Sequence, residues 1–240
     1  MAVLMTFTLA PRSHALVMTL DDLSTVGVDV IIVDDVDGGV GTWTPKGFST
    51  AADGSAGDGL VTFMGAVGSF IVNVTTGISK PIIGAPDKAR IDLNSVNVSG
   101  AAGHLEIMLT DTDFSALPYQ DSEGVVLTND WGGTTDGKVW AQGFVDPGNN
   151  AFGMGYTTGP QHFDTPGAFS ESLSLLTPAF PGTGMFSLTE VVRLHHAGAG
   201  DITSFDKSLS ADPVPEPTTM LLLGAGMIIL AGLGRKKFSN

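Results

Sequence analysis

Several segments of the chain alternate apolar and polar side chains with a period of two residues, and this pattern constrains the fold most. It is clearest in residues 70–75, 105–109, 169–175 and 186–194, while residues 28–33 are nearly apolar throughout. Side chains of an extended strand point alternately to opposite faces, so one face of each segment can pack while the other meets water. The pattern therefore predicts many half-buried β-strands.

Clusters of Gly, Asp, Asn and Pro separate these segments. They occupy residues 53–59, 132–137 and 146–150, and such residues favour turns. No long run with a helical period occurs before the C-terminal segment. Short strands joined by such turns predict an all-β fold, an antiparallel β-sandwich of which the jelly roll is one arrangement. Residues 111–166 have the weakest periodicity, which predicts long loops there.

The composition supports a single β-rich domain. Residues 16–212 are enough to build one sizeable core. Charged residues make up only 15% of the chain, whereas Gly accounts for 32 of 240 residues, a mixture that suits strands and turns. The chain has no cysteine, which excludes disulfides, thiolate metal sites and a cysteine nucleophile.

The body of the chain is strongly acidic. Residues 16–213 contain 24 Asp and Glu but only 7 Lys and Arg, a net charge of −17. Nucleic acids select basic patches, so this balance argues against a nucleic-acid partner. It fits a domain that faces an ion-rich extracellular medium.

The C-terminal segment predicts a membrane anchor. Residues 218–234 carry no charge, and these seventeen residues reach the lower limit for spanning a bilayer. Arg235, Lys236 and Lys237 follow directly, so residues 235–240 are expected to stay in the cytoplasm and the body to face outward. The partner of this segment would be the inner membrane. The alternative is a buried core helix.

A short proline motif, Val214-Pro215-Glu216-Pro217, precedes the predicted span. Two prolines around one acid favour an extended, accessible backbone that an enzyme could cut. The motif, the apolar span and the basic cluster occur in the order of the PEP-CTERM sorting signal of Gram-negative bacteria, which this tail resembles. The same segment is also known as the C-terminal domain of ice-binding proteins.

The resemblance to PEP-CTERM proteins has several implications. It implies export, recognition of residues 213–217 by an exosortase-type transpeptidase, and association with exopolysaccharide or biofilm. It also implies sorting to the cell surface or release from the membrane. Residues 91–98 and the stretch from 186–192 through 204–206 are similar to the bodies of such proteins, which indicates lineage and no activity.

The N-terminal residues have part of the pattern of an export signal. Residues 1–10 are apolar and Ser13-His14-Ala15 offers small residues for cleavage, but no cation precedes the apolar run. Residues 1–15 are therefore interpreted as a truncated signal peptide. The alternative is an edge strand of the fold.

Acidic side chains gather at predicted strand ends and turns. Carboxylates that converge with loop carbonyl oxygens are the ligands that Ca²⁺ prefers, although no segment here has the EF-hand pattern. Asp also stabilises turns, which is the alternative role. Paired carboxylates could instead serve glycoside hydrolysis, which needs a particular separation and a raised pKa. The candidate calcium ligands are Asp34, Asp35, Asp37, Asp53, Asp58, Asp111 and Asp113.

No motif of a known catalytic class is present. The chain has no Gly-x-Ser-x-Gly elbow, no His-Glu-x-x-His pair and no phosphate-binding loop. His195 and His196 are adjacent in a predicted strand and are expected to point to opposite faces. The large aromatic residues near predicted loops could stack on sugars or pack in the core. They are Trp43, Trp131, Trp140 and Tyr156.

Three functions remain in view. The first is a non-enzymatic exported surface or matrix protein, which the tail and the lack of catalytic motifs favour. The second is a calcium-dependent carbohydrate-binding or adhesion module, while ice binding is weakened because no regular Thr array occurs. The third is a secreted enzyme that acts on polysaccharide.

Overall fold

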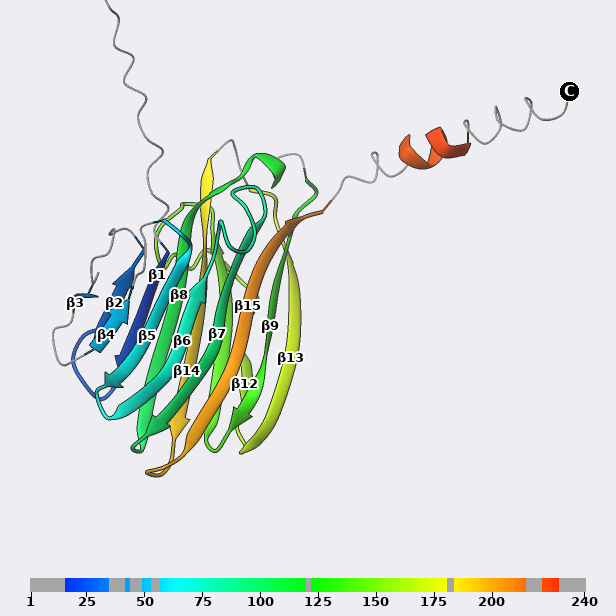
Figure 1. Cartoon of the computed structure of the whole chain (residues 1–240). Helices are drawn as coiled ribbons and strands as arrows, with labels where there is room; N and C mark the ends of the chain where they lie inside the picture. Colours follow the sequence, from blue (N-terminus) through cyan, green and yellow to red (C-terminus); the bar gives the residue numbers. More distant parts are fainter. Residues whose placement is uncertain are drawn as a thin grey trace, which may run out of the picture.

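The structure is a computed structural model that describes residues 16–34, 42–43, 49–52, 57–119, 122–180, 184–214 and 222–228. In these residues, antiparallel strands form two sheets that face each other (Figure 1). The predicted antiparallel β-sandwich is therefore confirmed. The predicted signal peptide, residues 1–15, lies outside the described residues.

Sheet A contains eight strands, with β12 (Gln161–Phe163) paired to β10 beside the main order. The main order is β11 (Tyr156–Thr157), β10 (Lys138–Asp146), β14 (Met185–His196), β8 (Gly103–Ser115), β1 (Val17–Asp22), β2 (Val30–Val33) and β3 (Thr42–Trp43).

Sheet B contains seven strands. Their order is β13 (Gly167–Thr177), β9 (Val125–Thr135), β15 (Ile202–Pro213), β7 (Ala89–Gly100), β6 (Phe70–Ile78), β5 (Leu60–Val67) and β4 (Ser49–Ala52). A short 3₁₀ helix, η1 (Leu117–Tyr119), lies at the end of the sandwich from which the chain leaves β15 (Figure 1).

The core lies between the sheets and is built from the inward-facing apolar residues of the predicted alternating segments. Leu105, Ile107 and Leu109 of β8 face inward and are fully buried. Leu188 and Val192 of β14 do the same. Burying aliphatic side chains of this size stabilises the fold by roughly 1.5–3 kcal/mol each.

Two of the predicted alternating segments pack less regularly. The register of β6 against β7 shifts after Val72 and again before Thr76, and Thr75 is fully buried. On β13, Phe169 is buried but Leu175 is 43% exposed. Among the described residues, β13 pairs only with β9, so an edge position explains its incomplete burial.

The prediction of long loops over residues 111–166 is wrong for most of that range. It contains the end of β8 together with β9, β10, β11 and β12. The alternation in β9 is hidden because Asn129 is an inward, fully buried residue and Gly132 and Gly133 follow it. A polar side chain at a core position and a glycine pair remove the contrast that periodicity depends on.

The predicted membrane anchor at residues 218–234 is described only in part. Residues 222–228 are helical, and the rest of the predicted span lies outside the described residues. Leu222, Leu223 and Ile228 of this helix are exposed. Within the described part of the chain, no helix has the length and apolar character needed to cross a membrane.

Candidate functional site

The body ends where the proline motif begins. β15 runs to Pro213, and the Val214 N–H donates to the Gly124 carbonyl oxygen at 3.0 Å. Among the described residues, this is the last backbone hydrogen bond between the tail and the sandwich. Pro215, Glu216 and Pro217 lie outside the described residues, as do the membrane-flanking Arg235, Lys236 and Lys237. The tail therefore follows the last strand of sheet B directly.

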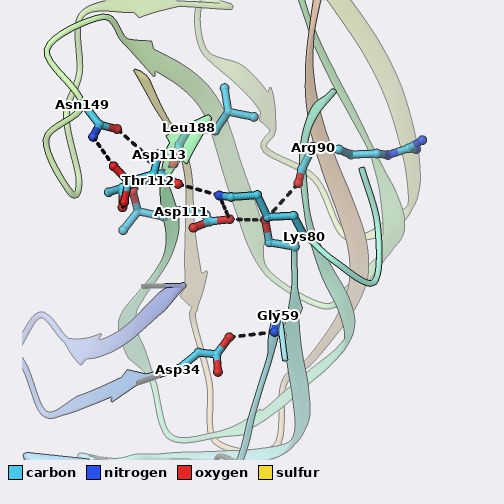
Figure 2. A network of polar contacts seen from close by, with 11 residues as sticks. Asp34, Gly59, Lys80, Arg90, Asp111, Thr112, Asp113, Asn149 and Leu188 are labelled. Atoms are coloured by element: carbon cyan, nitrogen blue, oxygen red, sulfur yellow. Dashed lines mark hydrogen bonds and ion pairs between the residues drawn. The ribbon is translucent and has the colours of Figure 1, made fainter. Parts of the chain in front are cut away.

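Of the predicted calcium ligands before β5, the structure describes Asp34 and Asp58. The Asp34 carboxylate accepts hydrogen bonds from the backbone N–H groups of Gly57 and Gly59, both at 2.7 Å. Figure 2 shows the contact with Gly59. Asp58 accepts from the Leu60 N–H at 3.0 Å. Both carboxylates therefore hold the loop that leads into β5, while Asp35, Asp37 and Asp53 lie outside the described residues.

Asp111 is the centre of a buried polar network. Its Oδ2 lies 2.7 Å from Lys80 Nζ and accepts a short hydrogen bond from Ser79 (Figure 2). Lys80 also donates to the Thr112 carbonyl oxygen at 2.5 Å and lies 3.7 Å from the centre of the Phe114 ring. Burial lowers the pKa of Lys80, and Asp111 opposes this shift. The network ties the end of β6 in sheet B to β8 in sheet A.

Asp113 has a different partner from Asp111. Its backbone N–H donates to Asn149 Oδ1 at 2.8 Å, and Asn149 Nδ2 donates to its Oδ1 at 2.7 Å (Figure 2). Asp111 and Asp113, both predicted calcium ligands, therefore have separate partners. Among the described residues, no three His, Cys, Asp or Glu side chains are grouped so that they could hold a metal ion. Calcium binding stays a prediction.

A second buried ion pair lies between the sheets. Glu190 of β14 and Lys207 of β15 face each other with Oε1 and Nζ 3.2 Å apart, and both side chains are fully buried. Burial raises the pKa of Glu190 to about 8 and lowers that of Lys207. The sequence carries a signal for the acid, because Glu190 falls in phase with the inward Leu188 and Val192. Its partner Lys207 carries the same signal, because it falls in phase with the buried Phe205 and Leu209 of β15.

The large aromatic residues that could stack on sugars lie partly in the core and partly on the surface. Trp131 is 4% exposed and packs against Phe163 and Phe169, with ring centres 5.5 and 4.8 Å apart. Trp140 is half-buried on the outer face of sheet A, where the Arg193 guanidinium lies 5.1 Å from its ring centre. Tyr156 is half-buried, and the side chain of Trp43 is outside the described part. Trp131 therefore serves the core.

The two adjacent histidines point to opposite faces, as predicted. His196 is fully buried, where Nε2 lies 3.0 Å from Thr203 Oγ1. His195 lies on the outer face of sheet A against His104, with ring centres 4.3 Å apart. One metal ion therefore cannot be bound by both His195 and His196.

The outer face of sheet B is hollowed over β13, β9, β15 and β7. The hollow has a volume of about 340 Å³. Strand register aligns Ser172, Asp130, Ser208 and Asp92 in one row across these strands. Asp206 lies two residues before Ser208 on β15 and also lines the hollow. Carboxylates and several hydroxyl groups are therefore gathered around one hollow, which Glu171 of β13 also lines.

Asp92 and Asp130 lie one strand to either side of Ser208. Neighbouring strands are about 4.8 Å apart, so the two carboxylates come from backbones separated by about twice that distance. Burial raises the pKa of Asp92, while Arg90 opposes the rise and Asp206 adds to it. Carboxylates spread over a face in this way can accept hydrogen bonds from separate hydroxyl groups of one extended ligand.

A family model for the PEP-CTERM protein-sorting motif matches residues 213–237. The chain therefore carries this sorting motif, which supports export and sorting by an exosortase. The resemblance seen in the tail sequence is confirmed. No curated protein matches the chain in sequence.

Several solved structures are similar to parts of the chain. TmCBM61 in complex with β-1,4-galactotriose is 15% identical over 57% of this chain and 86% of its own, with a TM-score of 0.31. The adhesin domain of Epf from Streptococcus pyogenes is 10% identical over 84% of this chain and 60% of its own, with a TM-score of 0.41. The mannan-recognising carbohydrate-binding module TmCBM27 is 13% identical over 70% of this chain and 100% of its own, with a TM-score of 0.28.

Proposed function

We propose that the chain is an exported, non-enzymatic surface protein whose tail is recognised and cut by an exosortase-type transpeptidase. The observation that carries this proposal is the position of the sorting motif. It begins at residue 213, and β15 ends at Pro213. A cut within residues 215–217 would leave every strand of the two sheets in the released body.

The membrane anchor is part of this proposal. The uncharged residues 218–234 would hold the chain in the inner membrane before the cut, with Arg235, Lys236 and Lys237 on the cytoplasmic side. The β-sandwich would then face outward, where its acidic surface would be solvated. After processing, the body would reach the cell surface or the surrounding polysaccharide matrix.

Binding rather than catalysis is proposed for the body. The described carboxyl group whose pKa is raised to about 8, Glu190, is sealed between the sheets, where no polysaccharide can reach it. A general acid for glycoside hydrolysis must contact the leaving-group oxygen. The raised pKa of Glu190 therefore supports a structural role.

Processing can be tested with the full chain in a Gram-negative bacterium that has an exosortase-type transpeptidase. We expect the mass of the surface form to correspond to loss of the segment after the motif. Glu216→Gln should leave the chain unprocessed. Asp212→Asn, which removes the same charge just outside the motif, should be processed normally. Equal processing of Glu216→Gln and the unaltered chain would contradict the proposal.

The second candidate function is binding of saccharide on the outer face of sheet B. The row of Ser172, Asp130, Ser208 and Asp92 favours it, because carboxylates and hydroxyls bind sugar hydroxyls well. Asp130→Asn with Asp206→Asn should weaken binding of a neutral oligosaccharide such as cellotriose, measured by calorimetry. Unchanged affinity would remove this face as the site.

Calcium dependence of such binding can be measured separately. A ligand at about a hundred times its Kd stabilises the folded state by roughly 2.7 kcal/mol. For a domain of this size, that corresponds to a rise in Tm of roughly 5–10 °C. Thermal unfolding of the full chain in calcium and in chelator would give this shift if the Asp clusters bind calcium. Equal Tm values would mean that these Asp residues do not bind calcium and only stabilise turns and loops.

A further inference from the structure

A second and larger hollow lies at the end of sheet B from which the tail leaves. Its volume is about 570 Å³, within the usual range for small-ligand sites. Outward-facing residues of β7 and β15 form one side, and the loop that contains η1 forms the other. Figure 1 shows η1 beside the upper ends of these strands. The hollow is therefore built from three regular parts of the fold.

The positive charges of this hollow are unusual in the body. Lys88 and Arg90 both line it and both are exposed. Within the described part of the chain, neither forms an ion pair, whereas the other described cations do. Those pairs are Lys80–Asp111, Lys138–Asp164, Arg193–Glu106 and Lys207–Glu190. In a body with a net charge of −17, two uncommitted cations at one hollow are available to an anion.

The other lining groups are acceptors and a rigid apolar floor. Asp87, Asp212 and the Ser210 hydroxyl lie around the same hollow. The floor includes Tyr119, whose buried hydroxyl donates to the Ala211 carbonyl oxygen at 2.7 Å. Carboxylates next to the cations would repel a ligand that carried negative charge alone. They suit one that carries an anionic group together with hydroxyl donors.

We propose that this hollow binds a carboxylate-bearing saccharide unit, such as a hexuronate in an acidic polysaccharide. Arg90 and Lys88 hold the sugar carboxylate, and Asp87, Asp212 and Ser210 accept its hydroxyl groups. A guanidinium matches the geometry of a carboxylate, which gives Arg90 the larger share of the selectivity. This inference rests on the proposed binding of saccharide by sheet B and adds the class of sugar.

The two hollows lie next to each other on the same strands. Arg90 and Asp92 occupy successive outward positions of β7, and Ser210 and Ser208 do so on β15. Residues two apart along a strand are separated by roughly 6.6 Å. One oligosaccharide can therefore reach from the cationic hollow to the acidic one, with its carboxylate at Arg90 and neutral hydroxyls at Asp92.

Calorimetric titration of the full chain tests this proposal with three probes: trigalacturonate, cellotriose and sodium sulfate. We expect trigalacturonate to bind most tightly and to bind less tightly as salt rises. Arg90→Gln should weaken it about tenfold or more, in line with the loss of a charge-assisted hydrogen bond. Lys88→Gln should act in the same direction. Lys138→Gln, which removes a cation from sheet A, should leave the affinity within about twofold.

Each result separates this inference from the function on which it rests. Equal binding of trigalacturonate and cellotriose, insensitive to Arg90→Gln, would overturn the carboxylate site and leave saccharide binding intact. If neither saccharide bound, both the carboxylate site and the proposed saccharide binding would be overturned. Sulfate binding as tight as that of trigalacturonate would show a plain anion site and overturn the saccharide assignment. Because Arg90 is exposed, its variant should keep the Tm of the unaltered chain, and Lys88→Gln provides a second test if it does not.

Discussion

Glu190 of β14 and Lys207 of β15 form an ion pair across the two sheets, with 3.2 Å between Oε1 and Nζ and no solvent exposure on either side. Neither atom completes a well-aligned hydrogen bond in the described structure. Burial therefore dominates both groups, raising the pKa of Glu190 and lowering that of Lys207. Removing two charges from water is costly, and attraction between them offsets that cost only when the geometry is good.

Lys207→Met should make the free energy of unfolding depend steeply on pH. The substitution removes the cation that lowers the Glu190 pKa. Glu190 will therefore stay protonated in the folded state at pH values above 4.5, where the unfolded state, with a Glu190 pKa of 4.5, has released the proton. A folded pKa above the unfolded one means that stability is full at low pH and is lost as pH rises. We expect a loss of about 1.4 kcal/mol per pH unit between about pH 5 and 8.

The matched control for Lys207→Met is the double variant Glu190→Gln with Lys207→Met, which has no titratable group at this place. Urea unfolding of both variants at several pH values isolates the contribution of Glu190, because all other groups are shared. The difference between them should grow with pH. A constant difference would mean that Glu190 is not held in its protonated form.

The strands could be predicted from sequence wherever apolar and polar residues contrast strongly. Leu105 to Leu109 of β8 is such a case, and its prediction as a strand is confirmed. β9 was not predictable in the same way, because a buried Asn129 and two glycines interrupt the contrast. Periodicity reports the average burial of a face, so polar residues that find partners inside the core remain invisible to it.

The polar contacts depend on which strands meet, which no local pattern encodes. Asp111 is visible as an acid near a strand end, but its partner Lys80 comes from the segment after β6 in the other sheet. Lys88 and Arg90 are cations separated by one residue in the sequence. Only the fold shows that, among the residues the structure describes, they form no ion pair and lie beside a hollow. Tertiary pairing, rather than residue type, therefore decides which charges are available to a ligand.

Asp111→Asn should destabilise the sandwich by about 3–5 kcal/mol near neutral pH, because it leaves the buried Lys80 without its carboxylate. Burial already lowers the Lys80 pKa below its usual 10.5, and Asp111 opposes that shift. In the variant, Lys80 of the folded state will lose its proton at a lower pH than Lys80 of the unfolded state. The folded state will therefore bind fewer protons than the unfolded state over a wider pH range below 10.5. Stability should therefore recover as pH rises toward 10.

The matched control for Asp111→Asn is Asp164→Asn, which breaks the exposed pair with Lys138. Exposed pairs contribute about 0–1 kcal/mol, so this variant should unfold at nearly the same urea concentration as the unaltered chain. A loss for Asp111→Asn that does not change between pH 7 and 10 would mean that removing Asp111 does not lower the pKa of the buried Lys80 further, which would contradict this prediction.

Gly133→Ala should loosen the contact between β9 and β15. A Cβ at this position would overlap the Ser204 carbonyl oxygen and lie 2.8 Å from Phe205 Cα, so the two backbones must separate. We expect a cost of about 1–3 kcal/mol, together with faster hydrogen exchange of β15 amides. Gly198→Ala is the control, because its nearest neighbour, Asp201, would be 3.6 Å away. Similar stabilities of the two variants would mean that the strands can separate without loss.

Asn149 should tolerate Gly better than Ala. Asn149 has a φ of 56° and makes two hydrogen bonds to Asp113, whose own φ is 62°. Both substitutions remove these bonds, which contribute about 0.5–1.5 kcal/mol each. Ala must also adopt a left-handed conformation at a further cost of about 1–2 kcal/mol, a cost that Gly avoids. Urea unfolding should therefore rank the chains as unaltered, then Asn149→Gly, then Asn149→Ala. If Ala and Gly were equally stable, the loop would not be held in this conformation by its contact with β8.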